Sequence, residues 1–262
     1  MDFGVQTFTV RRTQQKSLEE AYLPLIQMGI RSLEVARIKF SMENARRIKA
    51  LSEKYDIRIS SIQVKPKQVF GEAEKIIEFC NIVGCRCVVI SMLPFKCILG
   101  SEKSFYNFVD SLDGAYETYA ENGITLAYHH HNWEYIKLSC GKSRMEELLE
   151  RTEKIRFVHD TYWTARSGIA PSEQIRRFGK RLQGVHLRDL TFKRRGIDVI
   201  AADAAIGDGV ISFVDVLAAA EEVGCDYYVI EQNTEHPYEE IEKSLGSLLG
   251  IKAGLSSQGV DL

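Results

Sequence analysis

The feature of this sequence that most constrains its fold is a repeated order of helix, glycine and strand. Five runs show it: MGIRSLEV at Gly29, VGCRCVVI at Gly84, NGITLAYH at Gly123, FGKRLQGVHL at Gly179 and VGCDYYVIE at Gly224. Glycine ends a helix readily because it adopts a left-handed backbone without a Cβ clash. Strands that alternate with helices form parallel sheets, so the repeat predicts an α/β fold.

Helix starts are marked as well. Ser17 with Glu20 and Ser143 with Glu146 have capping-box spacing, and Ser212 precedes another helical run. In a capping box, the serine and the glutamate three residues later bond each other's backbone N–H groups. These signals place helices between the expected strands.

Eight β-rich runs are expected to form strands. They lie at about 3–8, 32–36, 57–64, 86–92, 124–130, 155–160, 182–189 and 226–232. Eight strand–helix units favour closure into a (β/α)8 TIM barrel, with residues 1–262 as a single domain. An open, doubly wound sheet is the alternative, but no GxGxxG motif follows the first run, which reads GVQTFT.

One expected connection is unusually long. The segment from Leu190 to Ile211, after the seventh strand, exceeds what a connection in a compact domain needs. Its basic run, Lys193 to Arg195, is typical of a solvated face, with contact to an anionic substrate group as the alternative. Because barrel active sites are built from segments that follow the strands, we expect the chemistry at that end of the barrel.

Charge and composition argue against several partners and locations. A formal net charge of −2 gives no basic field for nucleic acid or an anionic membrane, so neither is expected as a partner. No apolar stretch has membrane-spanning length, and the opening MDFGVQTFTV lacks the regions of a signal peptide. Six cysteines do not make a disulfide framework in a chain this long, which fits a reducing, cytoplasmic location.

Ionisable side chains end four consecutive expected strands: His129, Asp160, His186 and Glu231. Side chains alternate along a strand, so Leu126 and Tyr128 point outward and His129 points toward the barrel axis. The same alternation turns the other three inward. Any one of them could be a hydrogen-bonded residue of the barrel end, but buried charges at four successive strands need partners or a metal. Two imidazoles and two carboxylates suit one divalent ion such as Mn²⁺, Co²⁺, Fe²⁺ or Zn²⁺.

Further polar residues lie near this ring. The first three expected strands carry inward side chains that are predicted to contact a substrate: Gln6, Glu34 and Gln63. His131 shares the inward side of His129, whereas alternation turns His130 and His159 outward, as packing residues. Glu134 is interpreted as a hydrogen-bond acceptor in a loop rather than a further ligand.

Several motifs resemble those of sugar phosphate isomerase/epimerase-like proteins, within the xylose-isomerase-like TIM barrel superfamily. YHHHNWEY (128–135) is similar to the YHNHDFEF signature, HDTYWTARSG (159–168) to the DxYW…G segment, and GVHLRDL (184–190) to the HxKD segment. AIGDGVISF (205–213) resembles the GxGxID turn, and YYVIEQN (227–233) the VEQD strand end. With the opening GVQTFTVR, the resemblance covers nearly the whole chain in the right order.

The resemblance implies a catalytic divalent metal, Mn²⁺ foremost with Mg²⁺ also compatible, and a sugar or polyol as substrate. It carries over three metal ligands: Asp160, His186 and Glu231. Many superfamily members have a glutamate where this chain has His129. Trp163 matches a family tryptophan, whose indole suits the apolar side of a sugar. Arg188 stands in place of the usual lysine, and its high pKa and fixed fork favour anion binding over proton transfer.

The leading hypothesis is a metal-dependent isomerase or epimerase of a sugar, sugar phosphate or polyol, which abstracts a proton beside a metal-polarised carbonyl. Glu231 and a histidine, His129 or His131, would exchange protons on the two faces of the substrate carbon. A dehydratase or lyase acting on an inosose or 3-oxo-glycoside is the close alternative, since the same intermediate can expel a leaving group.

Two alternatives come from other functional classes. A DNA-repair endonuclease on this barrel needs a multi-zinc cluster and a basic DNA face, and the sequence indicates neither. A non-catalytic sugar sensor predicts no metal and no turnover. A small-molecule sugar or polyol is the expected partner, and a homo-oligomer is compatible with the sequence.

Overall fold

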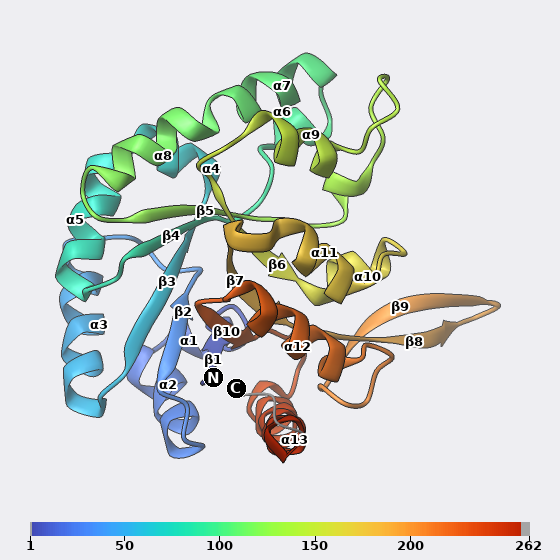
Figure 1. Ribbon diagram of the computed structural model, residues 1–262. Coiled ribbons are helices and arrows are strands. Elements are labelled where there is room, and N and C mark those ends of the chain that lie inside the picture. The colour runs from blue at the N-terminus through green and yellow to red at the C-terminus, as the bar shows by residue number, and fades with distance from the viewer. Residues whose placement is uncertain (1, 258–262) are drawn as a thin grey trace.

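The computed structural model describes residues 2–257, in which eight parallel strands close into a (β/α)8 TIM barrel (Figure 1). The barrel strands are β1 (Phe3–Gln6), β2 (Ser32–Val35), β3 (Arg58–Val64), β4 (Cys87–Ile90), β5 (Thr125–His129), β6 (Arg156–Asp160), β7 (Leu182–Leu187) and β10 (Tyr227–Ile230). Their order around the ring is β1, β10, β7, β6, β5, β4, β3 and β2, which closes the sheet without an edge. The predicted fold is therefore confirmed, and each barrel strand falls within an expected run.

Helices surround the barrel. They are α1 (Arg11–Gln14), α2 (Leu18–Gln27), α3 (Met42–Tyr55), α4 (Pro66–Gly71), α5 (Ala73–Val83), α6 (Phe95–Ile98), α7 (Glu102–Asp110), α8 (Leu112–Ala120), α9 (Arg144–Arg151), α10 (Thr161–Arg166), α11 (Pro171–Phe178), α12 (Phe213–Val223) and α13 (Pro237–Ser257). Among the described residues, no helix combines the length and apolar character needed to cross a membrane.

The local signals in the sequence are found where they were expected. All five glycines of the repeat have a positive φ, for example 73° at Gly84 and 77° at Gly224, the C-caps of α5 and α12. Ser143 forms a complete capping box with Glu146. At Ser17, the side chain accepts only the backbone N–H of Glu20.

Two apolar layers confirm the predicted strand alternation. Tyr228 and Ile230 of β10 belong to the large core between the strands and the helices. The barrel interior holds a smaller cluster: Cys87, Val89, Ala127, Val158, Tyr227 and Val229. A Cβ at Gly184 would lie 2.3 Å from the Tyr227 ring, so β7 needs a glycine beneath His186. The polar side chains thus sit on a closely packed apolar floor.

The long segment after β7 is a hairpin rather than an irregular loop. Antiparallel strands β8 (Asp189–Arg195) and β9 (Asp198–Ala204) pair from Asp189 opposite Ala204 to Arg195 opposite Asp198. Figure 1 shows this hairpin projecting away from the barrel. Its basic run, Lys193 to Arg195, is exposed near the turn and does not line the cavity described below.

Candidate metal centre and active site

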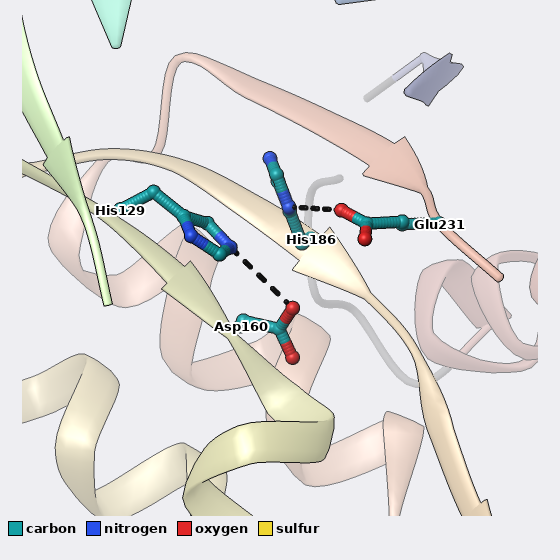
Figure 2. A group of neighbouring side chains, drawn as sticks. All are labelled: His129, Asp160, His186 and Glu231. Atoms are coloured by element: carbon teal, nitrogen blue, oxygen red, sulfur yellow. Dashed lines mark ion pairs between the residues drawn. The ribbon is translucent and has the colours of Figure 1, made fainter. Parts of the chain in front are cut away.

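The ends of four neighbouring strands bring four ionisable side chains together. His129 and Asp160 are the last residues of β5 and β6, His186 is the penultimate residue of β7, and Glu231 follows β10. All four are buried, and one potential ligand atom from each lies within 4.8 Å of the others. Figure 2 shows them converging from these strands. The sequence prediction that these four side chains meet is confirmed as geometry.

The contacts within this cluster leave several polar atoms without an aligned hydrogen bond. His129 Nε2 lies 3.4 Å from Asp160 Oδ2, and His186 Nδ1 lies 2.7 Å from Glu231 Oε2. Neither pair has hydrogen-bond geometry, and both ring nitrogens of His129 are buried without a partner. Buried polar atoms are normally satisfied. Three of the four residues, His129, His186 and Glu231, thus have unsatisfied atoms in the cluster. The set of two imidazoles and two carboxylates fits a divalent metal ion, which these groups would ligate.

Glu34 orients His186 from behind. Its Oε1 accepts a hydrogen bond of 2.8 Å from His186 Nε2, which leaves Nδ1 facing the cluster. The other oxygen of Glu34 accepts from Ser61 Oγ and from the Tyr227 hydroxyl. A carboxylate on the outer nitrogen fixes the tautomer of a metal-binding histidine. Glu34 was predicted to contact the substrate, but it is fully buried under His186 and does not line the cavity.

Arg188 connects two members of the cluster to the hairpin. Its Nη1 lies 3.2 Å from Asp160 Oδ2 and 3.3 Å from Glu231 Oε1, and its Nη2 donates to Asp203 of β9 at 2.7 Å. The guanidinium carbon lies 5.5 Å from the centre of the Trp163 ring. The donors of Arg188 are therefore already engaged by three carboxylates. Its buried charge therefore stabilises these carboxylates. It does not form an open site for an anionic substrate group, as the sequence had suggested.

The electrostatics of the cluster follow from this excess of carboxylates. Burial acts against ionisation of Asp160 and Glu231, but the charge of Arg188 and the contacts with the neighbouring histidines together outweigh it, which lowers the pKa of Asp160 and brings that of Glu231 to about 2. Burial alone would lower the pKa of His186, yet the adjacent Glu34 and Glu231 raise it to about 10. Four carboxylates, with Glu34 and Asp203 included, thus face two cations, Arg188 and the protonated His186. This imbalance favours binding of a cation.

A cavity of about 590 Å³ opens above the cluster. His129 and Glu231 line it together with four other side chains predicted for the site: Gln63, His131, Trp163 and Arg188. His131 Nδ1 and Trp163 Nε1 are buried without hydrogen-bond partners, so both residues carry an unsatisfied polar atom beside the cavity. Gln6 does not line the cavity; its side-chain amide donates to Gln63 Oε1 at 3.2 Å and so supports a residue that does.

The outward-facing residues brace the cluster. His130 Nε2 accepts the backbone N–H of Asp160 at 3.2 Å and lies 3.1 Å from His159 Nδ1. Burial lowers the pKa of both imidazoles, which keeps the pair neutral between Phe178 and the strands. Glu134 bonds the Tyr128 hydroxyl and the His131 N–H. None of these three residues belongs to the candidate ligand set.

Asp189 is a site residue that the sequence reasoning missed. Its carboxylate accepts the backbone N–H groups of Gly207, Gly209 and Ile211, at 3.0 to 3.2 Å, and thereby closes the base of the hairpin. A Cβ at Gly209 would lie 2.1 Å from Asp189 Oδ1. The signal was present in the motifs GVHLRDL and AIGDGVISF, whose aspartate and glycines meet across 20 residues.

Comparison with known proteins identifies the family. The inosose dehydratase of Geobacillus kaustophilus is 26% identical over 148 residues, which cover 52% of this chain and 48% of that protein. This chain therefore spans about half the length of the curated relatives it matches.

Solved structures extend the likeness over the whole barrel. A sugar phosphate isomerase/epimerase from Parabacteroides distasonis has a TM-score of 0.76 at 22% identity, with 94% of this chain and 93% of that chain covered. A probable 3-DHS dehydratase from Bacillus anthracis has a TM-score of 0.74 at 11% identity, with 95% and 99% covered. At these identities the likeness shows the fold. The profile of the xylose isomerase-like TIM barrel family matches residues 24–250, and this protein belongs to that family.

Proposed function

We propose that this protein is a divalent-metal-dependent enzyme that isomerises or epimerises a sugar or polyol by moving a proton on a carbon next to a carbonyl. One observation carries the proposal: four buried ligand groups converge, without aligned hydrogen bonds between them, at the floor of a ligand-sized cavity. The names of the similar structures agree with sugar chemistry, and the location at the C-terminal ends of barrel strands agrees with catalysis.

The candidate ligands are His129, Asp160, His186 and Glu231. A divalent ion held by them, Mn²⁺ foremost, would supply a Lewis acid for the carbonyl oxygen of the substrate. Arg188 holds Asp160, and Glu34 holds His186. A soluble, cytoplasmic enzyme with a small sugar or polyol as its partner remains our expectation.

Two groups on the wall of the cavity are suited to exchange protons with the substrate carbon. Burial lowers the pKa of His131 well below its usual value, so the imidazole is neutral and its unpartnered Nδ1 can accept a proton. Glu231 is ionised, and its unaligned Oε2 is the second candidate base. A proton taken by one group and returned from the other gives an epimer, whereas return to the neighbouring carbon gives an isomer.

A lyase is the second candidate, and a specific observation favours it. Glu231 is the only carboxylate among the described residues that line the cavity. A single carboxylate base suits proton abstraction followed by loss of a leaving group. The curated relatives that match half of this chain are inosose dehydratases.

The test is solvent-deuterium exchange in protein loaded with Mn²⁺. We expect one metal ion per chain by elemental analysis, and deuterium at the carbon beside the carbonyl in a panel of ketoses, inosose and 3-oxo-glycosides. An epimer or isomer whose mass differs from the substrate only by the exchanged deuterium supports the first candidate, and a product that has lost water or an aglycone supports the lyase. Absence of exchange with every member of the panel would contradict proton abstraction.

A further inference from the structure

The cavity above the metal centre has a second wall of a different character, which we call the apolar wall. It consists of residues that follow β1 to β4: Phe8, Ile38, Phe40, Pro66, Met92, Leu93, Pro94 and Phe95. His131, Trp163 and Glu231 line the same cavity from the other half of the barrel. One ligand could therefore occupy the metal centre and contact this wall at the same time.

The size of the cavity exceeds what one sugar ring needs. Its volume of about 590 Å³ lies within the range of about 300–1,000 Å³ that drug-sized ligands occupy. A bare sugar held by the cluster, His131 and Trp163 would leave the partly exposed members of the apolar wall facing water: Phe8, Ile38, Met92, Pro94 and Phe95. Phe95 is already 70% exposed at the rim, on the short helix α6. A contiguous apolar surface in a cavity often marks a ligand-binding groove, whereas a single exposed apolar side chain does not.

The edge of the apolar wall carries two guanidinium groups beside an aromatic ring. The Arg11 and Arg37 guanidinium carbons lie 3.9 and 5.3 Å from the centre of the Phe8 ring. Arg37 has a φ of 58°, a backbone conformation that residues other than glycine seldom adopt. Such outliers persist where the surroundings fix them, and they cluster at ligand-binding sites.

We propose that the apolar wall is a subsite for an apolar, preferably aromatic, substituent of the sugar. The substrate is then a glycoside or similar conjugate, with its hydroxylated ring at the metal centre and its substituent against Phe8, Ile38 and Phe95. The inference rests on the proposed function for the position of the sugar ring. The wall itself adds the substrate class.

A phosphate group fits this part of the cavity less well. The cations that line it, Arg37, Lys65 and Lys67, are exposed on the rim, where water competes for an anion. A flat ring on the apolar wall, in contrast, would bury apolar surface and lie near the same cations in a cation–π arrangement.

The experiment compares the binding of phenyl and methyl glycosides by calorimetry to the full-length protein loaded with Mn²⁺. The probes have gluco, galacto and manno configurations and no carbonyl, so they bind without turnover. We expect at least one phenyl glycoside to bind about tenfold more tightly than its methyl counterpart, from burial of one aromatic ring. Equal affinities, or no measurable binding of any phenyl glycoside, overturn the proposal, as does tighter binding of glucose 6-phosphate.

Two matched variants locate the effect. Phe95→Ser should reduce the preference for phenyl to about threefold or less, because it removes an aromatic ring from the wall. Phe192→Ser changes a similarly exposed phenylalanine, 58% against 70%, on the hairpin outside the cavity, and should leave the preference unchanged. Loss of preference in both variants, or in neither, contradicts the assignment.

Failure of this inference is distinguishable from failure of the proposed function. Exchange of deuterium into bare ketoses without any preference for phenyl glycosides removes the subsite and leaves the proposed function in place. A phenyl preference that depends on Phe95, in a protein that binds no metal and exchanges no deuterium, removes the proposed function and leaves the subsite.

Discussion

The two halves of the barrel mouth are built from the same strand–helix unit but differ in chemistry. Over β5, β6, β7 and β10, the strand ends themselves carry the ionisable cluster. Over β1 to β4, the segments beyond the strands carry the apolar wall, with exposed cations at its rim. Side chains on strands are held more rigidly than those on loops, so a barrel can fix metal ligands on one side and vary substrate contacts on the other.

Glu34 is the exception that links the halves. It lies on β2, in the half with the apolar wall, yet it reaches across the barrel to His186 on β7. The two halves therefore differ in the residues that face the cavity, whereas the residues that support the cluster from beneath come from both halves. The following predictions test this division, beginning with the largest expected effect.

Removal of a ligand from the ionisable half should abolish both metal binding and turnover. Asp160→Ala deletes a carboxylate that faces His129 and Arg188, and we expect activity to fall about 10⁴-fold, the scale of losing a catalytic group. Elemental analysis and circular dichroism should show a folded protein without metal. The control, Gln63→Ala in the other half, should keep its metal. A fully loaded Asp160→Ala protein would refute the assignment of this ligand.

Replacement of the supporting carboxylate should weaken metal binding without abolishing it. Glu34→Gln replaces the charged carboxylate that accepts the His186 N–H with a neutral amide. We therefore expect metal affinity to fall about 10- to 100-fold. Competition with a fluorescent chelator measures this change. Glu78→Gln makes the same substitution on an exposed face of α5 and should have no effect. Equal losses in both variants would mean that Glu34 has no special role.

Metal binding should displace a proton from His186. Its pKa of about 10 means that the metal-free imidazole is protonated at neutral pH, so an ion can bind Nδ1 only after that proton leaves. We therefore expect Mn²⁺ affinity to rise by up to about tenfold per unit between about pH 7 and about pH 9. Calorimetry in buffers of different ionisation enthalpy should count about one proton released per ion. Affinity that does not change over this range would exclude His186 as a protonated ligand.

The smallest effect is expected in the apolar half. Phe95→Ser replaces a side chain that is 70% exposed, so the free energy of unfolding should change by no more than about 0.5 kcal/mol. Metal content should also stay the same, because Phe95 is not one of the four candidate ligand residues. Urea denaturation and elemental analysis check both points. A loss of metal in this variant would show that the two halves are coupled.

The barrel and the ligand cluster were predictable from sequence because their signals are local. Glycines such as Gly84 mark helix ends through their own backbone preference, and alternation along β5 determines that His129 points inward. Closure of the barrel then turns the inward side chains of all eight strands toward one axis. The proximity of His129 to Asp160 could therefore be predicted from the alternation of side chains along the strands and from the barrel fold.

The hairpin was not predictable in the same way. Its arms, DLTFKRR and DVIAADA, mix apolar, charged and small residues. Half of these residues are exposed and only two are buried, so burial does not alternate along the arms. The turn at Gly196, with a φ of 66°, is a single signal in a segment that could also form a loop. Its position depends on Asp189 and Arg188, which bond to residues brought back by the fold.

The sequence by itself determined the eight strand–helix units, the inward direction of the candidate ligands and the family, because caps, glycines and alternation act between near neighbours. Tertiary structure alone decided that Glu34, 152 residues from His186, bonds to that imidazole and does not line the cavity. It also decided that loops after four separate strands share one apolar wall. The physical reason is that burial and partner choice depend on packing between distant segments, which no local pattern records.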